Sequence, residues 1–147
     1  MGDNVHMAFD ESGAVTNLSE QESWELLSAE ELGRLATAVV NEPEIYPVNF
    51  VVDDKTIVFR TAEGSKLLGL TVNNKVAFEV DGWDGVSGWS VLVRGQCEVL
   101  EHTDEIDEAE KLPLKPWVPT IKKTYVRIRP IAISGRRFRF GEEPPNW

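Results

Sequence analysis

Two cations and two hydroxyls surround one short turn in the segment FRTAEGSKLLGL. Arg60 and Thr61 end an apolar run, and Ser65 and Lys66 stand at the start of an expected helix. A helix that begins near Gly64 would point its free N–H groups and the positive end of its dipole at these side chains. This composition is typical of a phosphate site, although the GxxxxGK[ST] spacing of a Walker loop is absent. The alternative is an ordinary helix start capped by Ser65.

Other residues offer weaker candidates for chemistry. His6 lies in an aperiodic N-terminal stretch and His102 follows a strand beside acidic residues, so neither favours a hydrolytic triad. Cys97 is the only cysteine, which excludes an intrachain disulfide, and one Cys with two His does not build a usual zinc site. Glu79 and Asp81 share one face of an expected strand, but a charged sheet edge explains them at least as well as acid–base chemistry does.

Strands in hairpin order must position the turn. The runs IYPVNFVV and TIVFRT flank DDK, a pattern typical of a hairpin with a tight loop, and Pro47 favours an edge strand or a bulge. KVAFEVD and WSVLVRGQCEVL alternate apolar and polar residues, as strands with one buried face do. The run TYVRIRPIAISGRRFRF predicts one long strand or two, bent at Pro130 and turned at residues 134–135.

Only short helices are expected. Ser23 and Ser28 each resemble a helix N-cap, the second with Glu31 three residues later, which predicts helical turns over 24–27 and 29–34. TDEIDEAEKL predicts a short acidic helix that is exposed over most of its surface.

The element count defines the fold class. Six or seven strands with hairpin connections and few helices predict a mainly β protein built on a small closed antiparallel barrel. A doubly wound dinucleotide fold is disfavoured, because no alternating βαβ pattern is found. The 147 residues suffice for a single domain, expected at 19–147 after a flexible arm over 1–18.

Charge is unevenly distributed along the chain. The net charge is −10, but residues 1–120 hold 8 basic and 23 acidic side chains, whereas residues 121–147 hold 7 basic and 2 acidic. The acidic part disfavours nucleic acid and anionic membranes as partners. The basic segment could bind a phosphate or a partner's acidic face, or it could pair with the chain's own carboxylates. Neither a spanning apolar run nor a signal peptide is recognisable, so a cytoplasmic protein is expected.

The order of these motifs carries a resemblance. YPVNFVVDDKTIVFRTAEGSKLLGL, followed by VAFEVD and GWSVLVRGQCEVL, resembles the pyridoxamine 5'-phosphate oxidase-related flavin-binding split-barrel family. The resemblance runs from about Ser19 to Leu100, with GRLATAVV as the first barrel strand. It implies a six-stranded antiparallel split barrel that forms a homodimer, with flavin mononucleotide (FMN) in two clefts at the interface.

The resemblance also implies roles for individual residues. The strand that contains Pro47, Val48 and Asn49 would run along the edge of the isoalloxazine ring and offer backbone groups. Trp89 and Ser90 would lie near the cofactor, from the same subunit or from the other. Four side chains would hold the flavin phosphate: Arg60, Thr61, Ser65 and Lys66.

Two departures from the family pattern bear on the activity. The true oxidases carry two consecutive basic residues after the phosphate-site serine, whereas Leu67 follows Lys66 here, and their C-terminal Arg–His pair is not visible in SGRRFRFGEEPPNW. Oxidation of pyridoxamine phosphate is therefore not expected. The resemblance favours an FMN-dependent oxidoreductase of an unidentified small molecule, with no catalytic acid or base that can be named. The alternative is a non-catalytic module that binds or stores a flavin, a deazaflavin coenzyme or haem. Four tryptophans also fit simple packing in the barrel or the interface: Trp24, Trp83, Trp89 and Trp117.

Overall fold

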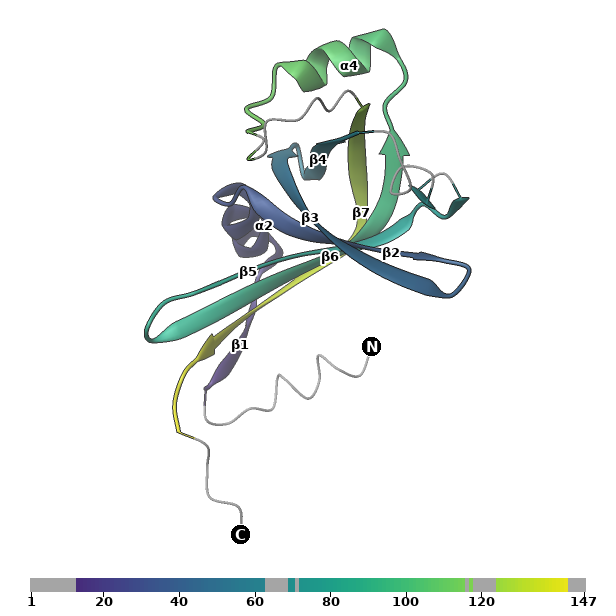
Figure 1. Cartoon of the computed structure of the whole chain (residues 1–147). Coiled ribbons are helices and arrows are strands. Elements are labelled where there is room, and N and C mark those ends of the chain that lie inside the picture. Colours follow the sequence, from purple (N-terminus) through teal and green to yellow (C-terminus); the bar gives the residue numbers. More distant parts are fainter. Residues whose placement is uncertain (1–12, 63–68, 71, 116, 118–123, 143–147) are drawn as a thin grey trace.

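Seven antiparallel strands and two helices make up the described part of the chain (Figure 1). The computed structural model describes residues 13–62, 69, 70, 72–115, 117 and 124–142. None of the helices in these ranges is long and apolar enough to cross a bilayer. The elements in chain order are β1 (Val15–Leu18), α2 (Glu20–Ser28), β2 (Leu32–Val39), β3 (Glu42–Asp53), β4 (Thr56–Thr61), β5 (Lys75–Trp83), β6 (Ser87–Val99), α4 (Thr103–Glu110) and β7 (Thr124–Arg139).

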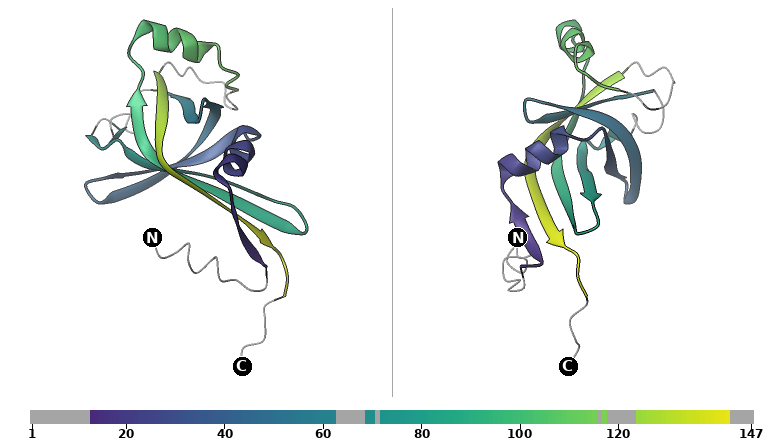
Figure 2. Two further views of the ribbon diagram at one scale, coloured as in Figure 1. Left: turned by 180° about the vertical axis from the view of Figure 1, so that it is seen from behind. Right: turned by 90° about the vertical axis from the view of Figure 1, so that its left-hand side faces the viewer.

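The sheet closes into a six-stranded barrel through β7. The strand order is β1-β7-β4-β3-β2-β5-β6, and β6 also pairs with β7, so the expected antiparallel barrel is confirmed. One edge of β7 pairs with β6 along nearly its whole length, while the other edge pairs first with β4 and then, near the C-terminal end, with β1. The β5–β6 hairpin and the second half of β7 therefore extend away from the β3–β4 part of the barrel (Figures 1 and 2).

Alternating apolar side chains fill the barrel. Val76, Phe78 and Val80 point inward from β5, as their spacing predicts, and Phe78 packs edge-on against Phe50 with ring centroids 4.9 Å apart. Helix α2 adds Trp24 and other apolar residues to this core. Helix α4 lies outside the barrel (Figure 2). A second cluster, which includes Ala109 of α4, consists of Val58, Leu100, Ala109 and Tyr125.

Two tight turns set the register of the strands around the site. Val40 and Asn41 have φ values of 49° and 63°, and Asp54 and Lys55 have φ values of 48° and 57°. Two consecutive left-handed residues define a type I′ turn, whose twist suits a two-residue hairpin. The tight hairpin expected at DDK is therefore confirmed, with Asp53 opposite Thr56.

Of the two helical turns expected near the N-terminus, the one over 24–27 is confirmed within α2, whereas its cap at Ser23 and the second turn are wrong. A single helix, α2, is capped by Ser19 in a capping box with Glu22, whereas the hydroxyl of Ser28 donates to the carbonyl of Trp24 within the helix. The expected helical turn over 29–34 is replaced by the start of β2, because pairing with β3 begins at Leu32. Tertiary pairing therefore overrides the local capping pattern.

Two further expectations need correction, and two are confirmed. Residues 15–18, assigned to a flexible arm, form β1 and pair with β7, while residues 134–135 continue β7 instead of turning. Pro130 lies at a register shift between β6 and β7, which is the expected bend. Pro47 lies in the part of β3 that pairs with β2 on one side only, because β4 pairs only with residues 50–53. Pro47 therefore occupies a local sheet edge, as expected.

Candidate functional site

The strands β3 and β4 part at one point, and five of the predicted site residues gather there. Their last register pair is Phe50 with Phe59. Beyond it, β3 continues beside β2 only, and β4 continues beside β7, where Arg60 and Thr61 pair with Tyr125 and Thr124. The residues on either side of this split are Pro47, Val48, Asn49, Arg60 and Thr61.

An unpaired strand edge borders the split. The backbone N–H of Phe50 donates to the carbonyl of Glu31, at 3.0 Å, on the β2 side. Because successive residues of a strand direct their backbone groups to opposite edges, Asn49 and Pro47 point theirs away from β2. No strand among the described residues pairs with that edge of β3 at these positions. Pro47 has no N–H to leave unpaired there, and no described strand pairs with the N–H of Asn49 or with the carbonyls of Asn49 and Pro47.

Arg60 carries a buried donor without a partner. Its Nε is buried and makes no hydrogen bond among the described residues. The guanidinium carbon lies 5.8 Å from the centroid of the Tyr125 ring, within the range of a cation–π contact. A buried unpaired donor is rare in native proteins and calls for an acceptor. A phosphate oxygen is an acceptor of the right charge for a guanidinium.

Thr61 faces the other way. It is only 4% exposed and its hydroxyl donates to the carbonyl of Ala62 at 3.1 Å. Neighbouring strand residues alternate between the two faces, so Thr61 lies on the barrel side and Arg60 on the outer side with Tyr125. The side chains of Arg60 and Thr61 could therefore share one ligand only beyond the end of β4. Ser65 and Lys66 lie outside the described residues.

A network of three hydrogen bonds joins β3 and Glu31 to Trp117. The side-chain amide of Asn49 donates to the carbonyl of Glu31 at 3.1 Å, and its oxygen accepts the backbone N–H of Trp117 at 2.9 Å. The indole Nε1 donates to the Glu31 carboxylate at 3.2 Å. Both the main chain and the side chain of Trp117 are thus tied down at the split. The sequence carries no short-range signal for this contact, because 68 residues separate its two partners.

Trp89 and Ser90 lie far from the split within one chain. Trp89 pairs with Arg137, whereas Arg60 pairs with Tyr125, and the intervening stretch of β7 measures roughly 40 Å along the strand at about 3.3 Å per residue, with one bend at Pro130. The Trp89 ring packs against the barrel core and lies over Gly82, where an added Cβ would stand 2.8 Å from the indole nitrogen. One chain alone therefore does not bring Trp89 and Ser90 to the split.

The acidic pair on β5 serves a different contact. Arg34 lies 2.8 Å from Glu79 and 3.3 Å from Asp81 on the outer face of the barrel. Partial burial, and then the neighbouring Asp81, raise the pKa of Glu79, while Arg34 opposes that shift. The pairing favours a structural role for these carboxylates. No group of three or more metal-ligating side chains occurs in the described ranges.

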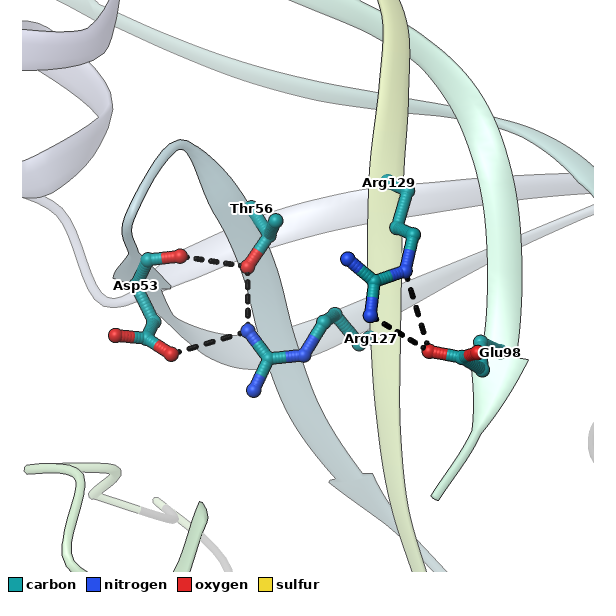
Figure 3. A network of polar contacts seen from close by, with 5 residues as sticks. All are labelled: Asp53, Thr56, Glu98, Arg127 and Arg129. Atoms are coloured by element: carbon teal, nitrogen blue, oxygen red, sulfur yellow. Dashed lines mark hydrogen bonds and ion pairs between the residues drawn. The ribbon is translucent and has the colours of Figure 1, made fainter. Parts of the chain in front are cut away.

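The basic segment binds the chain's own carboxylates (Figure 3). Arg127 donates to Asp53 at 3.0 Å and to the hydroxyl of Thr56 at 2.6 Å, and Arg129 contacts Glu98 through two nitrogens. For Arg127 and Arg129 the interpretation of internal pairing is confirmed. The Arg127 side chain is only 14% exposed, so this contact fixes the β3–β4 hairpin against β7.

Comparisons with known proteins agree with this architecture. Residues 19–137 match the family described as pyridoxamine 5'-phosphate oxidase, which extends the similarity well past Leu100. A Corynebacterium glutamicum structure, provisionally named a pyridoxamine 5'-phosphate oxidase, is 46% identical, with a TM-score of 0.82 and coverage of 89% of this chain and 98% of that one. The FAD binding protein from Mycobacterium smegmatis is 45% identical, with a TM-score of 0.75 and coverage of 85% and 99%. An uncharacterized protein of Mycobacterium tuberculosis is 45% identical over 94 residues, 64% of this chain and 86% of its own.

Proposed function

Because the chain belongs to the pyridoxamine 5'-phosphate oxidase family, we propose that it binds a flavin where β3 and β4 part. We propose further that it is an FMN-dependent oxidoreductase that acts on a small molecule. The observation that carries the proposal is the buried Nε of Arg60, which has no partner among the described residues and lies beside the edge of β3 that no described strand pairs. The M. smegmatis relative supports a flavin as the ligand, since it is named for binding FAD.

The residues at the split fit the two parts of a flavin. Arg60 offers a charged donor for the phosphate, and Tyr125 holds the guanidinium from the other side. The N–H of Asn49 and the carbonyl of Pro47 offer one donor and one acceptor to the polar edge of the ring. Ser65 and Lys66 follow β4 in the sequence and are proposed as further phosphate donors.

The chain's own part in the reaction is binding and orientation. A bound flavin would supply the redox chemistry, and the protein would fix its ring and keep water from one side of it. Because Trp89 and Ser90 are remote from Arg60 within one chain, their proposed contact with the cofactor requires a homodimer, in which a second chain brings them to the split. Pyridoxamine phosphate is not the proposed substrate, since Leu67 replaces the second basic residue.

A flavin holder without turnover is the second candidate. The name of the M. smegmatis relative describes binding and no reaction. An absorption spectrum of the purified protein identifies a bound flavin, and mass spectrometry of the released cofactor distinguishes FMN from FAD. Bleaching of the flavin bands by a reduced nicotinamide, followed by reoxidation with turnover, supports the oxidoreductase. A bound flavin that is not reduced by any reductant tested supports the alternative of a protein that binds flavin without turnover.

The phosphate contact has its own test, with Arg60→Met against Arg129→Met. Arg129 is a matched control because its side chain is 56% exposed and its guanidinium is paired with Glu98. Fluorescence titration should show that Arg60→Met weakens FMN at least about tenfold, as expected for a lost charge-assisted bond, and leaves riboflavin unchanged. Arg129→Met should change neither affinity. Equal affinities of wild type and Arg60→Met for FMN would refute the phosphate assignment.

A further inference from the structure

Trp117 is an exposed aromatic residue in a fixed orientation. Its side chain is 60% exposed, although its backbone N–H and its indole N–H are both hydrogen-bonded. The partners are Asn49 and Glu31, which are also joined to each other by the Asn49 amide. An exposed indole is usually free to change rotamer. Here two hydrogen bonds fix the residue while its ring surface stays in solvent, so the ring is a preorganised apolar surface.

The position of this surface relates it to the proposed site. Asn49 is the first residue of β3 beyond the last pair with β4, and its side chain alternates with that of buried Phe50. It therefore lies on the outside of the barrel, the same face on which Arg60 meets Tyr125. Through Asn49, the indole is anchored to the edge of β3 that no described strand pairs.

We propose that the indole of Trp117 stacks on the planar ring of the ligand bound at the split. Glu31 and Asn49 act as positioning residues that hold the indole in place. This inference rests on the proposed function and deepens it: Arg60 binds the phosphate, and Trp117 selects a flat, conjugated ring system. The proposal makes Trp117 a binding residue and gives it a role distinct from barrel or interface packing.

A ligand that has the flavin ring but no phosphate separates the proposed Trp117–ring contact from the proposed Arg60–phosphate contact. Lumiflavin carries the isoalloxazine ring and lacks the ribityl phosphate, so its affinity reports the ring contact alone. Trp117→Leu should weaken lumiflavin and FMN about tenfold, in line with the loss of one aromatic stack, and Trp117→Phe should stay within about threefold of wild type. Val40→Ala is the control, because Val40 is an exposed apolar residue in the β2–β3 turn, at the far end of β3 from Asn49 and outside the β5–β6 hairpin that a second chain would bring to the split.

Emission of the bound flavin provides a readout that a structural role would not change. An electron-rich indole in contact with an excited isoalloxazine ring quenches its fluorescence. At saturation, flavin bound to Trp117→Leu should emit more strongly than flavin bound to wild type or to Val40→Ala. Glu31→Ala should raise the emission partway, whereas Glu31→Gln, which keeps an oxygen acceptor for the indole N–H, should restore the wild-type value.

The outcomes distinguish this inference from the proposed function. If Trp117→Leu binds lumiflavin with unchanged affinity and emission while wild type binds FMN, the stacking proposal is overturned and the flavin site stands. If wild type binds neither lumiflavin nor FMN nor FAD, both proposals fail. Circular dichroism and a thermal melt establish that each variant is folded, and Trp117→Thr replaces Trp117→Leu if the latter is not.

Discussion

Gly33 on β2 has no room for a side chain. A Cβ at this position would lie 2.3 Å from Cζ of Phe78 and 2.9 Å from both Cε atoms. Phe78 is fully buried and packs edge-on against Phe50, so its ring cannot retreat without displacing the centre of the barrel. Overpacking of this kind costs about 1–3 kcal/mol. Since Phe78 is a rigid ring, we expect Gly33→Ala to lower the free energy of unfolding by about 2 kcal/mol, which corresponds to roughly 4–8 °C in melting temperature for a chain of this size.

Thermal and urea unfolding of four variants, Gly33→Ala, Gly85→Ala, Phe78→Leu and the Gly33→Ala/Phe78→Leu double variant, test this reasoning. Gly85→Ala is the control, because an added Cβ there meets nothing within 4 Å, and it should change the stability by less than about 0.5 kcal/mol. Phe78→Leu should lower the free energy of unfolding less in the Gly33→Ala background than in the wild type, since the smaller side chain leaves space for the new methyl group. A melting temperature of Gly33→Ala within about 1 °C of wild type would refute the claim that Phe78 is rigidly held.

Three shorter predictions concern the strand contacts and the cysteine. Arg127→Met should destabilise the fold by about 1–3 kcal/mol in urea unfolding, because it leaves Asp53 and the Thr56 hydroxyl without their donor, and a loss below about 0.5 kcal/mol would contradict the contact. The backbone N–H groups of Ser87 and Val86 lower the pKa of Asp84, so its stabilisation is present above the ordinary pKa and is lost as the pH falls through the lower, folded value. Asp84→Asn should therefore reduce the fall in melting temperature between about pH 5 and pH 2. If the variant and wild type lose melting temperature equally over this range, Asp84 does not stabilise the fold in this way. Burial raises the pKa of Cys97 to about 12, so iodoacetamide at pH 8 should label it only in denaturant, and rapid labelling of the native protein would show that the thiol is accessible.

Local patterns predicted much of the fold. The two-residue turn at Asp54 and Lys55 follows from its polar residues between apolar runs, and the inward set on β5 follows from strict alternation. Pro47 was predicted at an edge because it cannot donate to a ladder, and it occupies one. Each of these features depends on neighbours within a few residues, which is why the sequence alone suffices for them.

Features that depend on distant partners could not be predicted in this way. Residues 15–18 form β1 only because the far end of β7 offers them an edge, and Leu32 to Arg34 are extended because β3 pairs with all three and β5 pairs with Arg34. The hydrogen bond between Trp117 and Asn49 likewise joins two segments that no sequence pattern relates to each other. Motif order brought Pro47, Asn49 and Arg60 to one expected site, but the opposite faces of Arg60 and Thr61 became visible only from their packing.

The position of β7 after all the other described strands in the sequence has a consequence for folding. This strand supplies partners of β1, β4 and β6, and among the described strands only its pairing with β6 closes the barrel. During synthesis, therefore, β4 and β6 are made with unpaired edges and must wait for the last of the described strands to emerge. Long-range pairing of this kind makes folding slow and leaves sheet edges open to other chains in the meantime. A nascent chain stopped before residue 124 should therefore be a substrate for chaperones, and the ring of strands should form in a single late step once β7 is available.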